Sequence, residues 1–297
     1  MKNLIQHSIY LLLISTTLYT WPIHAQKMTD SGKPVIGQTF RDKLRDGSDG
    51  PLMVRLPAGQ FHMGDIQGKG EGDEKPLHQV SVDRFAIGVY EVTRKEFGRF
   101  VKATDYVTSA ERWGGCTAWV GDYFERVKTF NWRTPGFKQS EEHPVVCVSH
   151  RDVLKYLLWL NRQTKQRYRL PTEAQWEYAV RAGTNTTYWW GNGFVENKEN
   201  CDEYAEQTVP VGTFKPNQFG LYDTLGNAWE WVSDWYGDYS AEVQSNPKGG
   251  PPSEAKVIRG GGWALYSDTC RSANRGYGGI DNNRYDLGFR VVRLLRR

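Results

Sequence analysis

The stretch YRLPTEAQWEYA occupies residues 168–179, and within it Pro171 and Thr172 open a helix. Both residues are favoured where a helix begins. Proline has no backbone N–H that would need a partner, and the threonine side chain accepts a hydrogen bond from a free N–H of the first turn. Trp176 and Ala179 then recur at helical spacing on one face. Gly183 stands where glycine commonly ends a helix. The stretch therefore predicts a helix with a buried aromatic face.

Two further helices are predicted upstream of this one. Thr93 to Glu96 forms a capping box, and Phe97, Phe100 and Val101 follow on one face. Ser149 to Asp152 repeats the pattern ahead of an apolar series at helical spacing. His150 falls in the first turn of that helix, where we expect it on the surface.

Strands are predicted on both sides of these helices. Residues 53–56, 60–63 and 78–92 carry short apolar or alternating runs before the helices, and 257–259 and 288–292 do so near the C-terminus. An acidic, glycine-rich loop at 65–75 carries Glu71, Asp73 and Glu74, and such a loop is more often solvated than a cation site. Periodicity fades after Gly183. A single α+β domain over residues 52–297, with much irregular structure, is the simplest account.

Composition excludes several classes of protein. The 297 residues include 12 Trp, 16 Tyr and 12 Phe, whereas disordered chains are poor in aromatics. The net charge is only +4 and no long basic run occurs, so nucleic acid is not an expected partner.

The N-terminus is typical of a secretory signal. Lys2 precedes an apolar run that ends near Ala25, so residues 1–25 are expected to be removed and residues 26–51 to form a loose arm. The run is too short and interrupted to anchor the protein, and no other run reaches membrane length. A periplasmic or secreted location follows, with no membrane span after cleavage.

The chain has 4 cysteines, and an even number in an exported protein favours two disulfides. Three pairings are open. We prefer Cys116 with Cys147, because they flank one tryptophan-rich excursion, which leaves Cys201 with Cys270.

Nine short motifs stand in order along residues 52–295. They are PAGQFHMG (57–64), YEVT (90–93), YRLPTEAQWEYA (168–179), PVG (210–212), PN (216–217), FGLYD (219–223), GNAWEW (226–231), RGGGW (259–263) and GFR (288–290).

On these motifs the chain resembles the formylglycine-generating enzyme family, also called sulfatase-modifying factors. The resemblance implies a fold related to C-type lectins, with little regular secondary structure, and a structural calcium ion. The matching ligands are the carboxylates of Asp223 and Glu230 and the carbonyls of Gly226 and Ala228, hard oxygen donors that suit calcium. A second family site would use Asn200.

Aerobic members of the family bind copper with two cysteines, since thiolates suit Cu(I). In this sequence Leu265 stands at the position of the first copper cysteine. Cys270 matches the position of the second only when residues are counted from Gly260. One thiol cannot make a two-thiolate site, so copper is not expected. The family's non-haem iron branch needs a histidine cluster that this sequence lacks.

A third branch consists of periplasmic proteins that mature siderophores by oxidation, and it shares the loss of the copper cysteines. The resemblance therefore implies oxidative modification of a protein, a peptide or a peptide-derived substrate. The alternative is a non-catalytic, calcium-stabilised ligand-binding module on a C-type-lectin-like scaffold. The expected catalytic residues are Cys270, Trp229, Trp263 and Arg275, and the expected substrate-binding residues are Arg271, Asn274 and Tyr277. Two alternatives are equally open for Arg271 and Arg275: they hold an anionic substrate by bidentate contacts, or they pair with Asp or Glu inside the fold.

Overall fold

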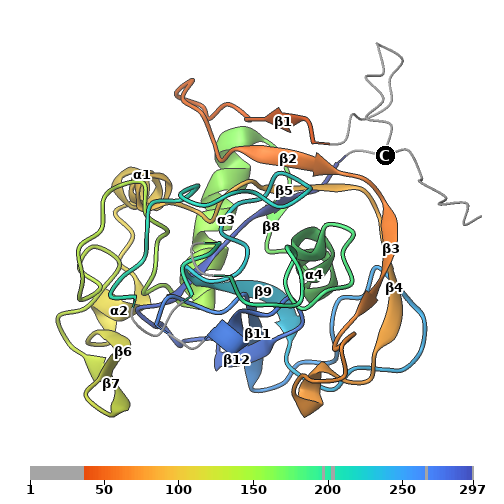
Figure 1. Ribbon diagram of the computed structural model, residues 1–297. Coiled ribbons are helices and arrows are strands. Elements are labelled where there is room, and N and C mark those ends of the chain that lie inside the picture. The colour runs from red at the N-terminus through yellow and green to blue at the C-terminus, as the bar shows by residue number, and fades with distance from the viewer. Residues whose placement is uncertain (1–36, 196–197, 202–204, 265–266, 296–297) are drawn as a thin grey trace, which may run out of the picture. The chain divides into compact units, whose positions relative to one another are not determined.

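The computed structural model describes residues 37–195, 198–201, 205–264 and 267–295, which are coloured in Figure 1. One sheet has five strands in the order β1 (Thr39–Phe40), β2 (Met53–Leu56), β5 (Phe85–Gly88), β14 (Val292–Arg293) and β8 (Tyr168–Arg169). β14 pairs antiparallel with both β5 and β8. The beginning and the end of the described chain thus contribute to the same sheet.

A second sheet has four strands and separates two unlike environments. Its order is β12 (Arg275–Gly279), β11 (Ala255–Arg259), β9 (Trp229–Trp235) and β13 (Leu287–Phe289). Trp231 is paired with Ile258 and Phe289, whereas the next row pairs Glu230 with Arg259 and Arg259 with Arg275. Because side chains alternate along a strand, one face is apolar and the other carries charges.

Two smaller β elements complete the strand inventory of the described residues. β3 (Gly59–Met63), β4 (His78–Val82) and β10 (Gln244–Ser245) form a three-stranded sheet. β6 (Cys116–Val120) and β7 (Tyr123–Val127) form a hairpin that projects at the lower left of Figure 1. The sequence analysis did not predict this hairpin.

The three predicted helices are confirmed, with a fourth short one between them. They are α1 (Arg94–Thr104), α2 (Ser109–Arg112), α3 (His150–Thr164) and α4 (Glu173–Arg181). A capping box begins each of the four, from Thr93, Thr108, Ser149 and Thr172. The end of α4 differs from the prediction: Ala182 is the C-cap, with φ of 45°, and Gly183 comes one residue later.

Helices α3 and α4 cover opposite faces of the four-stranded sheet. Tyr156 of α3 packs edge-on against Phe289, with ring centroids 5.3 Å apart, on the apolar face. On the charged face, the indole N–H of Trp176 in α4 donates to Glu230 over 2.8 Å. The predicted burial of Trp176 is confirmed, since the residue is fully buried.

His150 is not the surface residue that was expected. It is 5% exposed and its ring lies edge-on to Trp231, 5.6 Å away between centroids. The sequence pattern misplaced it because the start of α3 packs against the four-stranded sheet on one side, which covers His150 and leaves Arg151 exposed. Burial lowers the pKa of His150 to about 4, and the nearby cations Lys256 and Arg151 act in the same direction.

The packed part of the chain begins earlier than residue 52. Thr39 and Phe40 pair with Val54 and Met53, and Leu44 is buried in the core. The part of the expected loose arm from residue 37 onward is therefore integral to the sheet. The expected signal segment lies outside the described residues. Within the described part, no helix is long and apolar enough to cross a membrane.

Both preferred disulfides are present. Cys116 is bonded to Cys147 and Cys201 to Cys270, with Cα atoms 5.5 Å and 6.5 Å apart. The first fastens the β6–β7 hairpin to the segment that precedes α3. The second fastens the irregular region after α4 to the segment after the Gly-Gly motif.

Candidate functional site

Two of the expected catalytic residues meet around Gly262, on the apolar side of the four-stranded sheet. A Cβ atom at Gly262 would lie 3.0 Å from Cδ1 of Trp229, so the glycine and the indole ring are in close contact. Trp263 follows directly and packs edge-on against Phe137 and Tyr285, both at 5.0 Å between ring centroids. Both indole N–H groups are buried and have no acceptor among the described residues. The site thus holds two unused hydrogen-bond donors.

A carboxylate lies on the other side of the same glycine. The Cβ position of Gly262 is 3.4 Å from Oδ2 of Asp286, which is fully buried. Arg284 donates to both Asp286 oxygens, over 2.9 Å and 2.6 Å, and its guanidinium lies 5.9 Å from the Trp229 ring centroid. The sequence analysis missed this pair. The only signal was its position just before the GFR motif.

Cys270 does not provide a thiolate in this structure, because it is bonded to Cys201. It lies directly behind Gly261, where an added Cβ would collide with its Sγ. Gly261 also has φ of +75°, which glycine adopts without strain. Leu265, the other position matching a copper cysteine, lies outside the described residues. All four cysteines of the chain are therefore structural here.

Arg271 and Arg275 are not free to bind an anionic substrate. Arg271 donates to both oxygens of the buried Glu74, over 2.8 Å and 2.6 Å. Arg275 donates to both oxygens of Glu173, over 2.8 Å and 3.1 Å. Of the two alternatives for these arginines, the structure shows pairing inside the fold and not a substrate clamp, because their guanidiniums neutralise buried carboxylates. The 65–75 loop is likewise not simply solvated, since Glu74 is 0% exposed.

The charged face of the sheet carries a wider buried ion-pair network. Glu177 of α4 accepts from Arg181 over 2.8 Å, from the Gly64 N–H over 3.0 Å, and from Arg259. Removing one partner from such a pair typically costs about 3–5 kcal/mol, because a buried charge is left unpaired. The motif at 168–179 thus positions α4 electrostatically as well as by packing.

Tyr277 lies apart from the tryptophan pair, and Asn274 is tied to the charged face through its backbone. The carbonyl of buried Asn274 accepts a hydrogen bond from Arg259. Tyr277 is 62% exposed and packs on Tyr236, with ring centroids 4.6 Å apart. Tyr277 and Arg275 share the face that bears Arg259, opposite to Trp231. The expected cleft is therefore divided by the sheet, and its residues do not form one site.

The expected calcium ligands fit a cation only in part. Oδ2 of Asp223 accepts from the Gly212 N–H over 2.6 Å, whereas Oδ1 is buried without a donor among the described residues. Burial raises the pKa of Asp223 to about 6. Glu230 does not fit, because its two oxygens already accept from Arg290 and Trp176.

Two further buried acids stand near Asp223 and were missed by the sequence analysis. Glu91 accepts from Asn227 Nδ2 and the Ala228 N–H over 3.1 Å and 3.2 Å. Glu199 accepts from Trp189 over 3.0 Å, and its other oxygen has no donor among the described residues. Burial, followed by the nearby Asp223, raises the pKa of Glu91 and Glu199 well above the usual range.

The remaining expected ligand, Asn200, lies beside Gly226. Its carbonyl accepts from the Asn227 N–H over 2.7 Å, and its Nδ2 donates to the Gln207 carbonyl over 3.0 Å. Among the described residues, no three carboxylate, imidazole or thiol side chains are grouped closely enough to hold a metal ion. A calcium ion here would therefore depend on backbone carbonyls such as those of Gly226 and Ala228.

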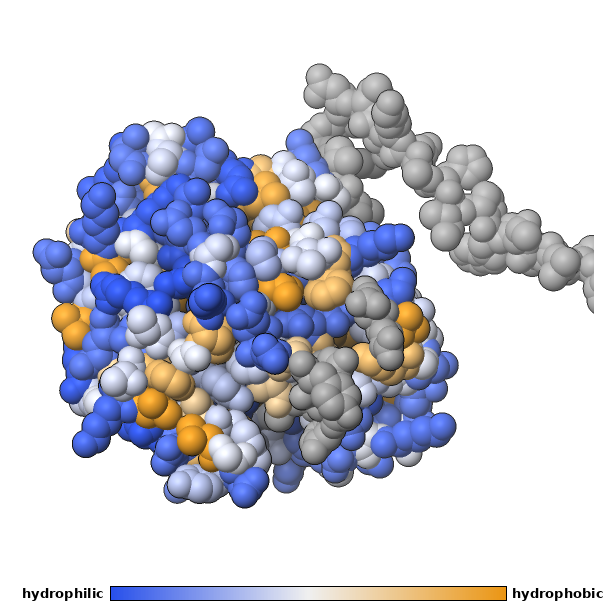
Figure 2. Space-filling model, turned by 60° about the vertical axis from the view of Figure 1, so that its left-hand side comes forward, coloured by the Kyte–Doolittle hydropathy of each residue, from blue (hydrophilic) through white to orange (hydrophobic). Residues whose placement is uncertain are grey.

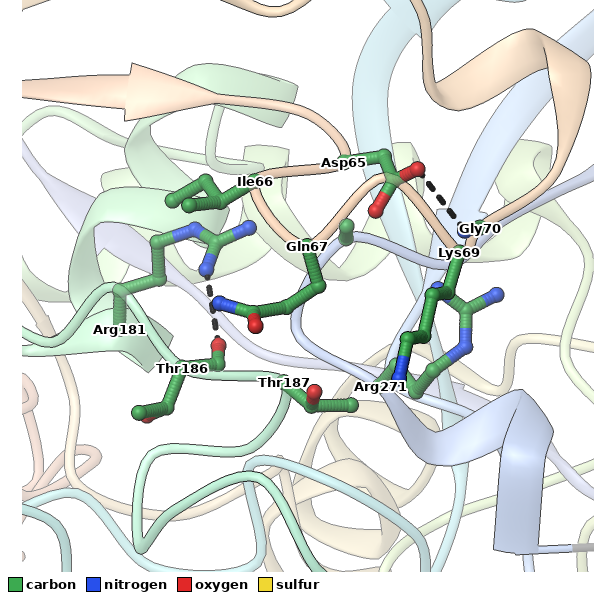
Figure 3. Close-up of a pocket in the computed structure, with 10 residues that line it drawn as sticks. Asp65, Ile66, Gln67, Lys69, Gly70, Arg181, Thr186, Thr187 and Arg271 are labelled. Atoms are coloured by element: carbon green, nitrogen blue, oxygen red, sulfur yellow. Dashed lines mark hydrogen bonds between the residues drawn. The ribbon is translucent and has the colours of Figure 1, made fainter.

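Two cavities lie on the α4 side of the molecule. The one in Figure 3, between the 65–70 loop, Arg181 and Arg271, has a volume of about 30 Å³, which is the space of roughly one water molecule. The other has about 210 Å³ and is lined by residues that include His78, Glu173 and Asp234. Burial, then the adjacent Glu173, raises the pKa of Asp234 to about 7.

Comparison with known proteins identifies the class of this fold. Residues 39–295 match the family model described as "Sulfatase-modifying factor enzyme 1-like domain". The chain therefore belongs to the sulfatase-modifying-factor family, and the family resemblance inferred from its motifs is confirmed.

Individual relatives agree with this assignment. The chain is 36% identical to bovine formylglycine-generating enzyme, over 81% of this chain and 74% of that protein. It is 34% identical to the enzyme of Streptomyces coelicolor, over 80% and 88%. The structure of PvdO from Pseudomonas aeruginosa matches with a TM-score of 0.74 and 33% identity, covering 89% of this chain and all of that one. The expected fold class is thereby confirmed.

Proposed function

We propose that this protein oxidises a peptide or peptide-derived substrate without a copper dithiolate. Membership of the sulfatase-modifying-factor family supports oxidation as the reaction class. The observation that argues against a copper dithiolate is the disulfide between Cys270 and Cys201, which leaves no free thiolate behind the Gly-Gly motif. The match to PvdO over its whole length shows that the same architecture is shared well beyond the animal enzymes.

We infer that the residues around Gly262 bind and orient the substrate. The unused N–H groups of Trp229 and Trp263 are donors that a substrate carbonyl, phenol or amide oxygen would satisfy. The Asp286 carboxylate, held by Arg284, would accept from a substrate N–H or O–H. In the proposed reaction the substrate loses two hydrogen atoms, and dioxygen takes up the two electrons and two protons to form hydrogen peroxide.

Calcium is part of the proposal as a structural ion. The Asp223 oxygen without a donor and the neighbouring buried Glu91 and Glu199 support a cation there, because a bound cation would stabilise the charged forms that burial disfavours. Glu230 is assigned a different role. It fixes Arg290, whose guanidinium also donates to the Asp223 carbonyl over 3.1 Å. When bound, the ion would hold the turn that leads into β9.

We also propose that the protein is exported to the periplasm or the medium after residues 1–25 are removed. Two disulfides in one chain support this location, because disulfides persist mainly in oxidising compartments. Peptide-derived substrates outside the cytoplasm are then the ones that the protein would meet.

A ligand-binding module without catalysis is the second candidate. Mouse "Inactive C-alpha-formylglycine-generating enzyme 2" is 32% identical over 82% of this chain and 85% of that protein, so the fold persists without the family activity. The β6–β7 hairpin favours binding as well, since Trp119, Tyr123 and Phe124 are all exposed near its turn.

Mass spectrometry separates the two candidates. The purified protein is incubated in air with cysteine-containing peptides and with reduced, aromatic peptide-derived compounds. Loss of two hydrogens from a thiol-free aromatic compound, with stoichiometric hydrogen peroxide and only in the presence of the protein, supports the oxidase, because thiols are oxidised by air without a catalyst. Saturable binding by calorimetry without any mass change would favour the binding module and refute the oxidase.

A further inference from the structure

A basic groove runs along α1, on the side of the molecule that Figure 2 brings forward and where hydrophilic residues predominate. It has a volume of about 740 Å³ and lies between α1 and residues 132–141. Its lining includes one acid, Glu141, against five cations: Arg94, Lys95, Arg99, Lys102 and Arg133. This local excess equals the formal net charge of the whole chain, +4.

Most of these charges are not neutralised within the fold. Arg94 donates to the Arg133 carbonyl over 2.8 Å, and Arg99 to the Asp49 carbonyl over 2.8 Å. Their charges interact with Glu141 and with Asp46, Asp49 and Glu96, but within the described residues neither guanidinium forms an ion pair at 4 Å or less. Lys102 has no ion-pair partner within the described ranges. Lys95 is 3.9 Å from Glu141, and both side chains are largely exposed, so this pair contributes little. Only Arg133 has a close acidic partner, Glu111.

The groove also contains buried donors that lack acceptors. Trp132 lines it and is only 7% exposed, yet its indole N–H has no acceptor in the described part of the chain. Nε of Arg94 is buried and unpartnered in the same way. Arg133 stacks over the Trp132 ring, 4.3 Å from its centroid. Unused donors beside unpaired cations are the chemistry that recognises an oxyanion.

The shape of the groove decides between a peptide and a membrane. Lys95, Arg99 and Lys102 lie on one face of α1, and a rise of 1.5 Å per residue spreads them over about 10 Å. Alternate side chains of an extended peptide are about 6.7 Å apart, which is close to the step of about 6 Å from Lys95 to Arg99 along the helix. A flat bilayer surface would not reach Trp132, which lines the groove but is only 7% exposed.

We propose that this groove binds an acidic, extended polypeptide segment, separately from the site around Gly262. The segment's carboxylates pair with Arg99 and Lys102 and accept from the buried donors of Trp132 and Arg94. The proposal does not depend on oxidation, because the groove lies on α1 and shares no lining residue with the tryptophan pair.

The test measures binding of a fluorescein-labelled hexaglutamate peptide by anisotropy at low salt. Saturable binding is expected, about tenfold weaker in Lys102→Glu, because one attraction becomes a repulsion. Lys248→Glu is the matched control, an exposed lysine with the same charge change elsewhere, and should bind like the unaltered protein. Trp132→Phe should also weaken binding while leaving the peptide's salt dependence unchanged.

Three results would overturn the proposal. Equal weakening by Lys102→Glu and Lys248→Glu would mean that only net charge matters. Inorganic phosphate that displaces the peptide at equal concentration would reduce the groove to a general anion site. Binding to phosphatidylglycerol vesicles in the absence of peptide binding would assign the surface to lipid. Circular dichroism of each variant verifies that a lost signal does not come from unfolding.

Discussion

Arg271 holds Glu74 through two parallel hydrogen bonds of 2.8 Å and 2.6 Å, across 197 residues of sequence. Glu74 is 0% exposed, so its charge depends on this one guanidinium for compensation. The pair fastens the acidic loop at 65–75 to the segment that follows the Gly-Gly motif. An arginine that the motif pattern placed in a substrate site is thus a structural counter-ion.

Substituting Arg271 should therefore destabilise the protein through Glu74. We expect Arg271→Ala to lower the free energy of unfolding by about 3–5 kcal/mol, as for other broken buried ion pairs. Glu74→Gln added to it should restore part of the loss, because the buried charge is removed with its partner. Urea unfolding of the single and double variants measures both effects. A double variant no more stable than Arg271→Ala would contradict this account.

The buried His150 predicts sensitivity to acid. Its pKa is lowered from 6.5 to about 4 in the folded protein, so below pH 6.5 the unfolded chain takes up a proton that the folded chain does not. The stability that the protein gains by keeping His150 neutral is therefore fully present above pH 6.5. It decreases by roughly 3 kcal/mol as the pH falls towards 4.

His150→Gln should flatten the pH dependence of the free energy of unfolding between pH 6.5 and 4. His62→Gln, at an exposed position on β3, serves as the control and should leave the dependence unchanged. Thermal unfolding across this range provides the measurement. An unaltered slope in His150→Gln would show that the group does not stay neutral inside the protein.

Phenylalanine substitutions at two buried tryptophans should differ in their effect on stability, because only one of the two indole N–H groups has an acceptor. Trp229→Phe removes an N–H that has no acceptor among the described residues, whereas Trp176→Phe breaks the 2.8 Å bond to buried Glu230. We expect Trp176→Phe to cost about 1–3 kcal/mol more stability than Trp229→Phe, because it removes a hydrogen bond to a buried carboxylate. Substrate affinity should instead fall in Trp229→Phe. Equal stability losses would argue that Trp229 has a partner.

The Cys201–Cys270 disulfide should stabilise the folded protein. It closes a loop of 69 residues, for which the loop-entropy relation gives about 4 kcal/mol. The double substitution Cys201→Ser, Cys270→Ser should show a loss of that order in chemical unfolding. A loss below about 1 kcal/mol would mean that the cross-link is not structural.

Local features of this fold were predictable and long-range ones were not. The capping boxes at Thr93, Ser149 and Thr172 each lie within four residues, so the helix starts follow from sequence alone. The fates of Arg271 and Arg275 depend on Glu74 and Glu173, which lie 197 and 102 residues away. Nothing near either arginine indicates its partner.

The candidate site shows the same contrast. Trp229 and Trp263 were predicted because both belong to motifs of the family. Asp286 was missed because its contact with Gly262 arises only when β13 pairs parallel with β9. Tyr277 was assigned to the same cleft from proximity in sequence, yet the strand alternation turns it to the other face.

The central claim is that substrate oxidation here does not require a copper dithiolate. The direct measurement is substrate turnover by the chelator-treated protein, followed by mass spectrometry, with copper content determined in the same sample. The account predicts loss of two hydrogens from the substrate by copper-free protein, and retention of this activity in folded Cys270→Ser. Turnover that requires added copper and disappears in Cys270→Ser would contradict it.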